Sequence, residues 1–86
     1  MRLVFTDTAW DQYIHWQNED KKTLKKINRL IKSINRDGLL NGEGKPELLK
    51  HDRSGECSRR IDEENRLVYA MVDGQLVIKS CKGHYE

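Results

Sequence analysis

The chain has 86 residues, of which 36% are apolar and 35% charged, and its formal net charge is +2. This length fits one domain, so we expect a single domain over residues 1–86. A domain of this size buries only about 60–65% of its unfolded surface, which argues against a deep site for a flavin or nicotinamide. We therefore expect no cofactor.

No segment predicts insertion into a membrane. The longest apolar run, residues 67–72, is far too short to span a bilayer. Residues 1–7 lack the apolar core of a signal peptide. We expect a cytoplasmic protein without a membrane partner.

Potential metal ligands are few and have the wrong spacing. The chain has three histidines and two cysteines, without a Cys-x-x-Cys or His-x-x-x-His motif. Cys57 and Cys81 are expected to be reduced thiols in strands, since two cysteines do not make a disulfide framework. We expect no metal site and a chemistry that needs no metal.

The first 38 residues predict a short strand and two helices. Residues 2–6 alternate as a strand, and Thr6 or Asp7 can cap a helix over residues 8–18. Asp20 can cap a second helix that runs to about residue 36 and ends at Gly38. Residues at helical spacing form the expected apolar stripes. They are Trp10, Tyr13, Ile14 and Gln17 in the first helix, and Leu24, Ile27, Leu30 (or Ile31) and Ile34 in the second.

From residue 47 onward the apolar period changes from 3.6 to 2. Residues 38–46 hold three glycines and the only proline, which predicts a loop. Strands are expected at 47–51, 56–61, 66–72 and 75–81, with Asp73-Gly74 as a hairpin turn. This order predicts an α+β fold, in which two N-terminal helices pack on one face of a four- to five-stranded antiparallel sheet. The other face is then available as a working surface.

Basic residues gather on the second predicted helix. Residues 21–36 hold seven of the 16 Lys and Arg residues and no acidic residue. Such a surface attracts polyanions, although a merely solvated helix face is the alternative. A second basic group lies in the predicted strands. Arg59 and Arg60 are adjacent, so they point to opposite faces and at least one lies on the open face, where it could bind phosphate. The alternative is that both pair across strands with acids such as Glu56 or Glu64.

Three further residues complete the requirements for RNA cleavage. Glu47 follows Lys45-Pro46 at the start of a strand, and His84-Tyr85 lie beside the C-terminus. Cleavage needs a base for the 2′-hydroxyl, cations for the phosphorane and an acid for the leaving oxygen. The alternatives are a surface charge at Glu47 and an inert polar tail.

Motifs along the whole chain resemble the YoeB-type (Txe) toxins of the RelE/ParE toxin–antitoxin superfamily. The combination of motifs and their order carry the resemblance. They are Ala9-Trp10-Asp11, Tyr13, Trp16-Gln17, Asp20-Lys21, Lys25-Lys26-Ile27-Asn28, Gly44-Lys45-Pro46-Glu47, Leu49-Lys50-His51, Ser54-Gly55, Ser58-Arg59-Arg60-Ile61, Arg66-Leu67-Val68-Tyr69 and His84-Tyr85.

The resemblance implies a microbial-ribonuclease-like fold and a type II toxin that cleaves mRNA in the ribosomal A site. The expected products are a 2′,3′-cyclic phosphate and a 5′-hydroxyl, and the expected consequence is inhibition of translation. It also implies neutralisation by a YefM-type antitoxin, binding of operator DNA only together with that antitoxin, and a homodimer.

The matching motifs assign roles to individual residues. Glu47 corresponds to the general base, His84 to the general acid, and Arg66 to the arginine that stabilises the transition state. The residues expected to line the RNA site are Lys50, Arg59 and Tyr85. The basic residues expected to contact the ribosome are Lys21, Lys22, Lys25, Lys26 and Arg29.

Four positions depart from the family pattern. Leu48 stands where many members have proline, Cys57 where a Trp is common, and Lys82 where the tail has Arg, while Glu86 is an extra residue. Two other functions compete with the ribonuclease. They are a ParE-like toxin that inhibits a topoisomerase without cleaving RNA, and a simple RNA-binding module.

Overall fold

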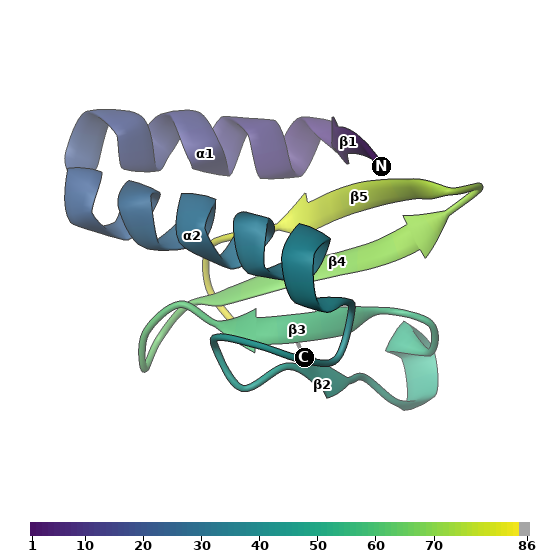
Figure 1. Ribbon diagram of the computed structural model, residues 1–86. Helices are drawn as coiled ribbons and strands as arrows, with labels where there is room; N and C mark the ends of the chain where they lie inside the picture. The colour runs from purple at the N-terminus through teal and green to yellow at the C-terminus, as the bar shows by residue number, and fades with distance from the viewer. Residues whose placement is uncertain (85–86) are drawn as a thin grey trace.

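The computed structural model describes residues 1–84. Helices α1 (Asp7–Glu19) and α2 (Lys21–Asp37) lie side by side against one face of a five-stranded sheet of order β1-β5-β4-β3-β2 (Figure 1). The strands are β1 (Arg2–Phe5), β2 (Glu47–Leu48), β3 (Cys57–Arg60), β4 (Arg66–Val72) and β5 (Gln75–Ser80). The predicted α+β fold with two helices on one face is confirmed.

The sheet is mixed, whereas the sequence predicted an antiparallel one. Strands β2, β3, β4 and β5 pair antiparallel along the sheet. The first strand, β1, pairs in parallel with β5, with Arg2 opposite Gln75. Tight turns dictate the direction of consecutive strands, but no turn joins β1 to β5, so only the packed structure decides their relative direction.

Both helices begin at the predicted caps. Thr6 Oγ1 accepts a hydrogen bond from the Ala9 N–H and donates one to the Lys79 carbonyl, both at 3.1 Å. Asp20 separates the helices and accepts from the N–H groups of Lys22 and Thr23. Gly38 ends α2 with φ 99° as expected, but its ψ of 176° lies outside the left-handed helical region.

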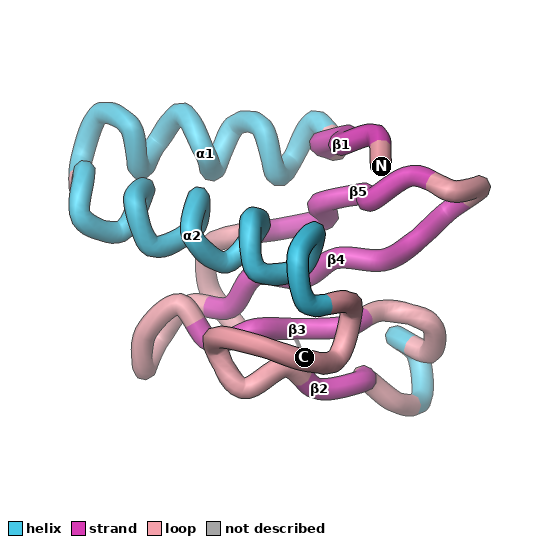
Figure 2. Tube along the Cα trace, viewed as in Figure 1, coloured by secondary structure: helices cyan, strands magenta, loops and turns pink. Residues whose placement is uncertain are grey.

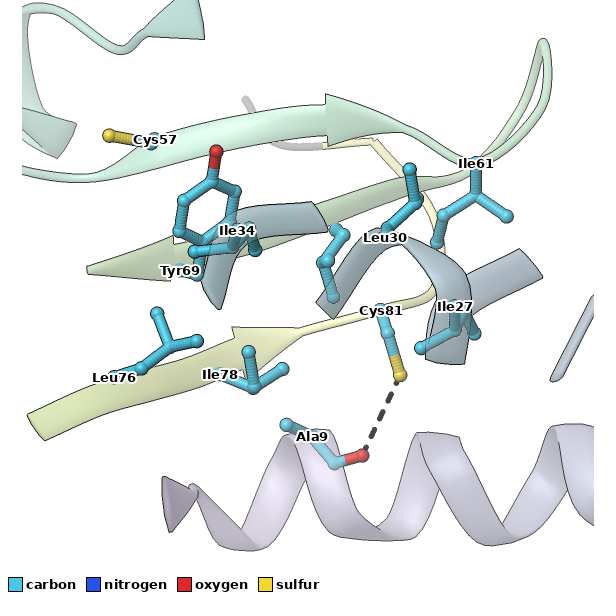
Figure 3. Close-up of a cluster of buried hydrophobic side chains, with 11 residues drawn as sticks. Ala9, Ile27, Leu30, Ile34, Cys57, Ile61, Tyr69, Leu76, Ile78 and Cys81 are labelled. Carbon is cyan, nitrogen blue, oxygen red and sulfur yellow. Dashed lines mark hydrogen bonds between the residues drawn. The ribbon is translucent and has the colours of Figure 1, made fainter. Parts of the chain in front are cut away.

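The core lies between the helices and the sheet (Figure 3). The predicted stripe of α2 is confirmed, since Ile27, Leu30 and Ile34 are all buried. In α1 the buried residue is Ala9, while Trp10 of the predicted stripe is 51% exposed. The small Ala9 side chain lets α1 approach the sheet closely, and Cys81 Sγ donates to the Ala9 carbonyl across this contact.

The second half of the chain follows the predicted strands to within one residue at each end, except for the first, which is much shorter. Strand β2 ends at Leu48, short of the expected strand 47–51, and a 3₁₀ turn (His51–Arg53) begins at His51. His51 has φ 59°, which no extended strand accommodates. Asp73 and Gly74 have φ values of 50° and 76°, as a two-residue hairpin turn requires. No helix within residues 1–84 is long and apolar enough to cross a membrane.

Candidate active site on the helix-free face of the sheet

The register of three strands brings Glu47 and Arg66 to the same face of the sheet. Arg59 faces α2, so the alternation of side chains turns Ser58 and Arg60 to the opposite, helix-free face. Glu47 lies opposite Ser58, and Arg66 lies opposite Arg60. Glu47 and Arg60 are exposed and Arg66 is half-buried. One carboxylate and two guanidinium groups therefore share this surface.

The tail is fastened to the start of β4, next to this surface. The Gly83 N–H donates to Asn65 Oδ1 at 2.8 Å, and the Gly83 carbonyl accepts from the Arg66 N–H at 3.0 Å. His84 follows directly and is exposed. These two bonds hold the backbone that carries His84 beside Arg66. Tyr85 lies outside the described residues.

A turn over residues 62–65 supports both Arg66 and the tail. Asp62 Oδ1 accepts from the N–H groups of Glu64 and Asn65, at 2.8 and 2.7 Å, and Asn65 Nδ2 donates to the same carboxylate. Partial burial works against ionisation, but these hydrogen bonds outweigh it and hold the pKa of Asp62 below its ordinary value. Arg66 Nη1 donates to the Asp62 carbonyl at 2.8 Å. The turn thus aligns Arg66 and Gly83 together.

Arg59, predicted to line the RNA site, is instead fully buried on the helix side. Each of its five N–H donors has an acceptor, at 2.6–3.0 Å. The acceptors are Tyr69 Oη, Ser33 Oγ and the carbonyls of Glu43, Gly38 and Asn41. A guanidinium enclosed in this way does not reach RNA, so the expected role of Arg59 is corrected.

The arginine that the sequence reasoning missed is Arg60. It is exposed on the helix-free face, directly opposite Arg66. The short turn between β3 and β4 could have revealed this residue from the sequence. It fixes the register of the two strands, which pairs Arg60, and not Arg59, with Arg66. The alternative of ion pairs with Glu56 is also wrong, since Glu56 binds Arg53 at 2.9 Å and Lys79 at 3.0 Å.

The centre of the helix-free face is packed, and its functional groups lie around the margin. Ser58 and Val68 are each 1% exposed, although both point away from the helices. Lys50, predicted to line the site, is exposed just before the 3₁₀ turn. The charged groups of this face, Glu47, Arg60 and Arg66, therefore lie around the buried Ser58 and Val68.

The basic surface of α2 is partly neutralised. Glu43 binds Lys26 at 3.1 Å and Arg29 at 2.7 Å, and these bonds lower its pKa to about 2. Within residues 1–84, the exposed Lys21, Lys22 and Lys25 form no ion pair. Of the five residues expected to contact the ribosome, these three lysines carry the uncompensated charge.

The chain is similar in sequence to known proteins and similar in fold to solved structures. The chain is 52% identical to Toxin YoeB of Escherichia coli K12 over 85 residues, which is 99% of this chain and all of the relative. Its structure matches YoeB of a Staphylococcus aureus YoeB–YefM heterotetramer with TM-score 0.91 and 49% identity, over 99% and 98% of the two chains. A solved S. aureus YoeB dimer matches over the same shares with TM-score 0.92 and 49% identity.

The fold and these relatives define a bacterial toxin of the class that is paired with an antitoxin. Residues 5–85 match the family described as the YoeB-like toxin of bacterial type II toxin–antitoxin systems, and the chain belongs to this family. The resemblance found in the sequence is thereby confirmed.

Proposed function

We propose that this toxin is a ribosome-dependent endoribonuclease that cleaves mRNA in the A site and so inhibits translation. The observation that supports the proposal is that Glu47, Arg60 and Arg66 share one face, with the backbone before His84 bonded to Arg66. Strand register brings Glu47 to the face of Arg60 and Arg66, and the Gly83 hydrogen bonds bring the backbone before His84 to Arg66.

The proposed reaction uses the nucleophile that RNA itself carries. Glu47 accepts the proton of the 2′-hydroxyl, whose oxygen attacks the adjacent phosphorus. The bond from phosphorus to the 5′-oxygen breaks, and His84 donates a proton to that oxygen. The products are a 2′,3′-cyclic phosphate and a 5′-hydroxyl, so atoms and charge balance without a further reactant.

The paired arginines suit the phosphate in this scheme. Like charges directly opposite one another on neighbouring antiparallel strands destabilise the sheet. A phosphorane between Arg60 and Arg66 would relieve that repulsion and accept hydrogen bonds from two planar forks. The phosphorane therefore removes the repulsion between the two arginines, and they bind it more tightly as negative charge develops on its oxygens.

The relatives support proposals for the partners. The S. aureus structures contain YoeB with YefM and a YoeB dimer. We infer that this toxin forms a homodimer and is neutralised by a YefM-type antitoxin, and that operator DNA is bound only by their complex. A toxin that acts on bacterial ribosomes works in the cytoplasm.

The decisive experiment compares Glu47→Gln with the wild type on ribosomes that carry a defined message, with the 5′ ends mapped. Glutamine keeps the size of Glu47 but cannot take the proton, so cleavage should fall about 10²–10⁴-fold while ribosome binding stays the same. Glu19→Gln, at the exposed end of α1, is the matched control and should cleave normally. Growth arrest without message cleavage would instead favour a topoisomerase-directed toxin.

A further inference from the structure

The loop between α2 and β2 is organised around a buried cation. Arg59 donates to three of its carbonyls, those of Gly38, Asn41 and Glu43, and Tyr69 Oη, which accepts from Arg59 Nε, donates to a fourth, that of Leu39. A buried charge is tolerated only where its donors are satisfied. Carbonyls of the loop accept three of the five hydrogen bonds that Arg59 donates. The loop therefore cannot move away without leaving these donors of the guanidinium unpaired.

Close packing leaves this loop little room. In Figure 2 the segment between α2 and β2 doubles back over β3. A Cβ at Gly42, where φ is 100°, would clash with Ser33 Oγ, and one at Gly44 would meet Leu30 Cδ2 at 2.7 Å. The loop is therefore held by contact as well as by hydrogen bonds.

The end of this loop is the beginning of the proposed catalytic strand. The Gly44 carbonyl accepts from the Arg60 N–H at 2.6 Å, and two residues, Lys45 with φ 51° and Pro46, then lead into Glu47. Strand β2 is only two residues long. Because the strand is so short, the loop before it contributes to the position of Glu47, together with the pairing of β2 with β3.

We propose that Arg59 is a positioning residue for Glu47. Its guanidinium, on the helix side of the sheet, fixes the loop whose last turn delivers the Glu47 carboxylate to the RNA-facing side. This inference rests on the proposed role of Glu47 as the base. It assigns the two adjacent arginines of β3 to different tasks, with Arg60 at the substrate and Arg59 behind it.

The test uses two variants of different severity. Arg59→Lys retains the charge but offers only three donors to five acceptors. Tyr69→Phe leaves Arg59 in place and removes the hydroxyl that joins Arg59 to Leu39. Each should lower the single-turnover cleavage rate at saturating toxin about tenfold or more, since small misplacements of a reacting group cost up to about 10²-fold. Ribosome affinity should stay within about twofold.

The control is Leu76→Val, a buried substitution in β5, whose partner on β4 is Met71 and not Tyr69. It lowers stability without touching the loop, so its cleavage rate should equal that of the wild type at a temperature where all variants are folded. A loss of rate that simply follows the loss of melting temperature across all three variants would overturn the proposal.

A double-mutant cycle separates positioning from general damage. In the Glu47→Gln background, adding Tyr69→Phe should change the rate less than about twofold, because the group that it misplaces is already disabled. Full additivity of the two losses would contradict the proposal and leave the base role of Glu47 intact. A wild-type rate for Glu47→Gln alone would instead overturn the proposed function itself.

Discussion

At the scale of single residues, the central feature is the pair of arginines across β3 and β4. Arg60 and Arg66 are register partners on the helix-free face, and Arg66 is additionally fixed through Nη1 to the carbonyls of Asp62 and Asn65. A guanidinium held by backbone carbonyls keeps its plane in one orientation, and that orientation matters for a fork that binds two oxygens. Shape as well as charge should therefore be needed at Arg66.

Arg66→Lys should impair the chemical step although the charge is kept. Lysine offers one compact cation, so the oriented contacts with the phosphorane oxygens are lost. We expect the single-turnover rate to fall about 10-fold or more at saturating ribosomes, measured by rapid quench with the 5′ ends mapped. A rate within about twofold of the wild type would mean that Arg66 acts through diffuse charge alone.

At the scale of elements, α2 combines two kinds of basic residue. Lys26 and Arg29 bind Glu43 of the following loop, whereas Lys21, Lys22 and Lys25 near the start of the helix are exposed. Only a charge that lacks an acidic partner gains fully from contact with phosphates. The start of α2 should therefore dominate docking to the ribosome.

Replacing these three lysines with Gln should weaken ribosome binding and flatten its salt dependence. If each lysine meets one phosphate, the slope of log K against log salt should fall in magnitude by about 2–3. Glu43→Gln should act in the opposite direction, because it releases Lys26 and Arg29 from their ion pairs. Binding isotherms at several salt concentrations measure both effects, and unchanged slopes would identify α2 as a merely solvated face.

The same carboxylate predicts a pH dependence of stability. Arg29 and Lys26 lower the pKa of Glu43 from 4.5 to about 2, so the ionised form is favoured in the folded state. The stabilisation is complete above the unfolded pKa of 4.5 and is lost as the pH falls through the folded pKa of about 2. Denaturant unfolding should show Glu43→Gln to be less stable than the wild type at pH 7, with the gap closing near pH 2. A gap independent of pH would contradict this ion-pair origin.

At the scale of the whole molecule, the tail is tied to two separate parts of the fold, α1 and the start of β4. The Cys81 N–H donates to Gln12 of α1 at 2.6 Å, and Trp16 Nε1 donates to the Cys81 carbonyl at 2.9 Å. Two residues later, Gly83 binds the residues that open β4. The backbone up to Gly83 is therefore anchored to the rest of the fold.

Removing residues 84–86 should abolish cleavage and growth arrest without unfolding the protein. Within residues 1–84, the bonds that anchor the tail are made by Cys81 and Gly83, and the truncated chain keeps both residues. The reaction loses its proposed proton donor and the adjacent aromatic Tyr85. Removing Glu86 alone should leave the rate within severalfold, because it changes the local charge by one unit in a screened position. Circular dichroism verifies folding, and an active truncation at Gly83 would eliminate His84 as the acid.

Features encoded by neighbouring residues were predictable from the sequence. The caps at Thr6 and Asp20, the stripe of α2 and the Asp73-Gly74 turn depend on contacts within a few positions, and all are found. The stripe of α1 was misassigned at Trp10 and Gln17, which are exposed, whereas the small Ala9 is buried where the helix approaches the sheet. The helical period of the sequence shows which residues could be buried, but packing against the sheet decides which of them are buried.

The sequence by itself determined the family, the two-helix-on-sheet order and the residue types of the candidate site. Alternation shows that Arg59 and Arg60 face opposite ways, but it does not say which of the two faces the helices. Only the tertiary structure decided that Arg59 is enclosed by the loop and that Arg60 joins Arg66 outside. The parallel pairing of β1 with β5 was decided in the same way. The physical reason is common to both, since register and burial depend on partners distant in the chain, whose contacts form only when the whole sheet assembles.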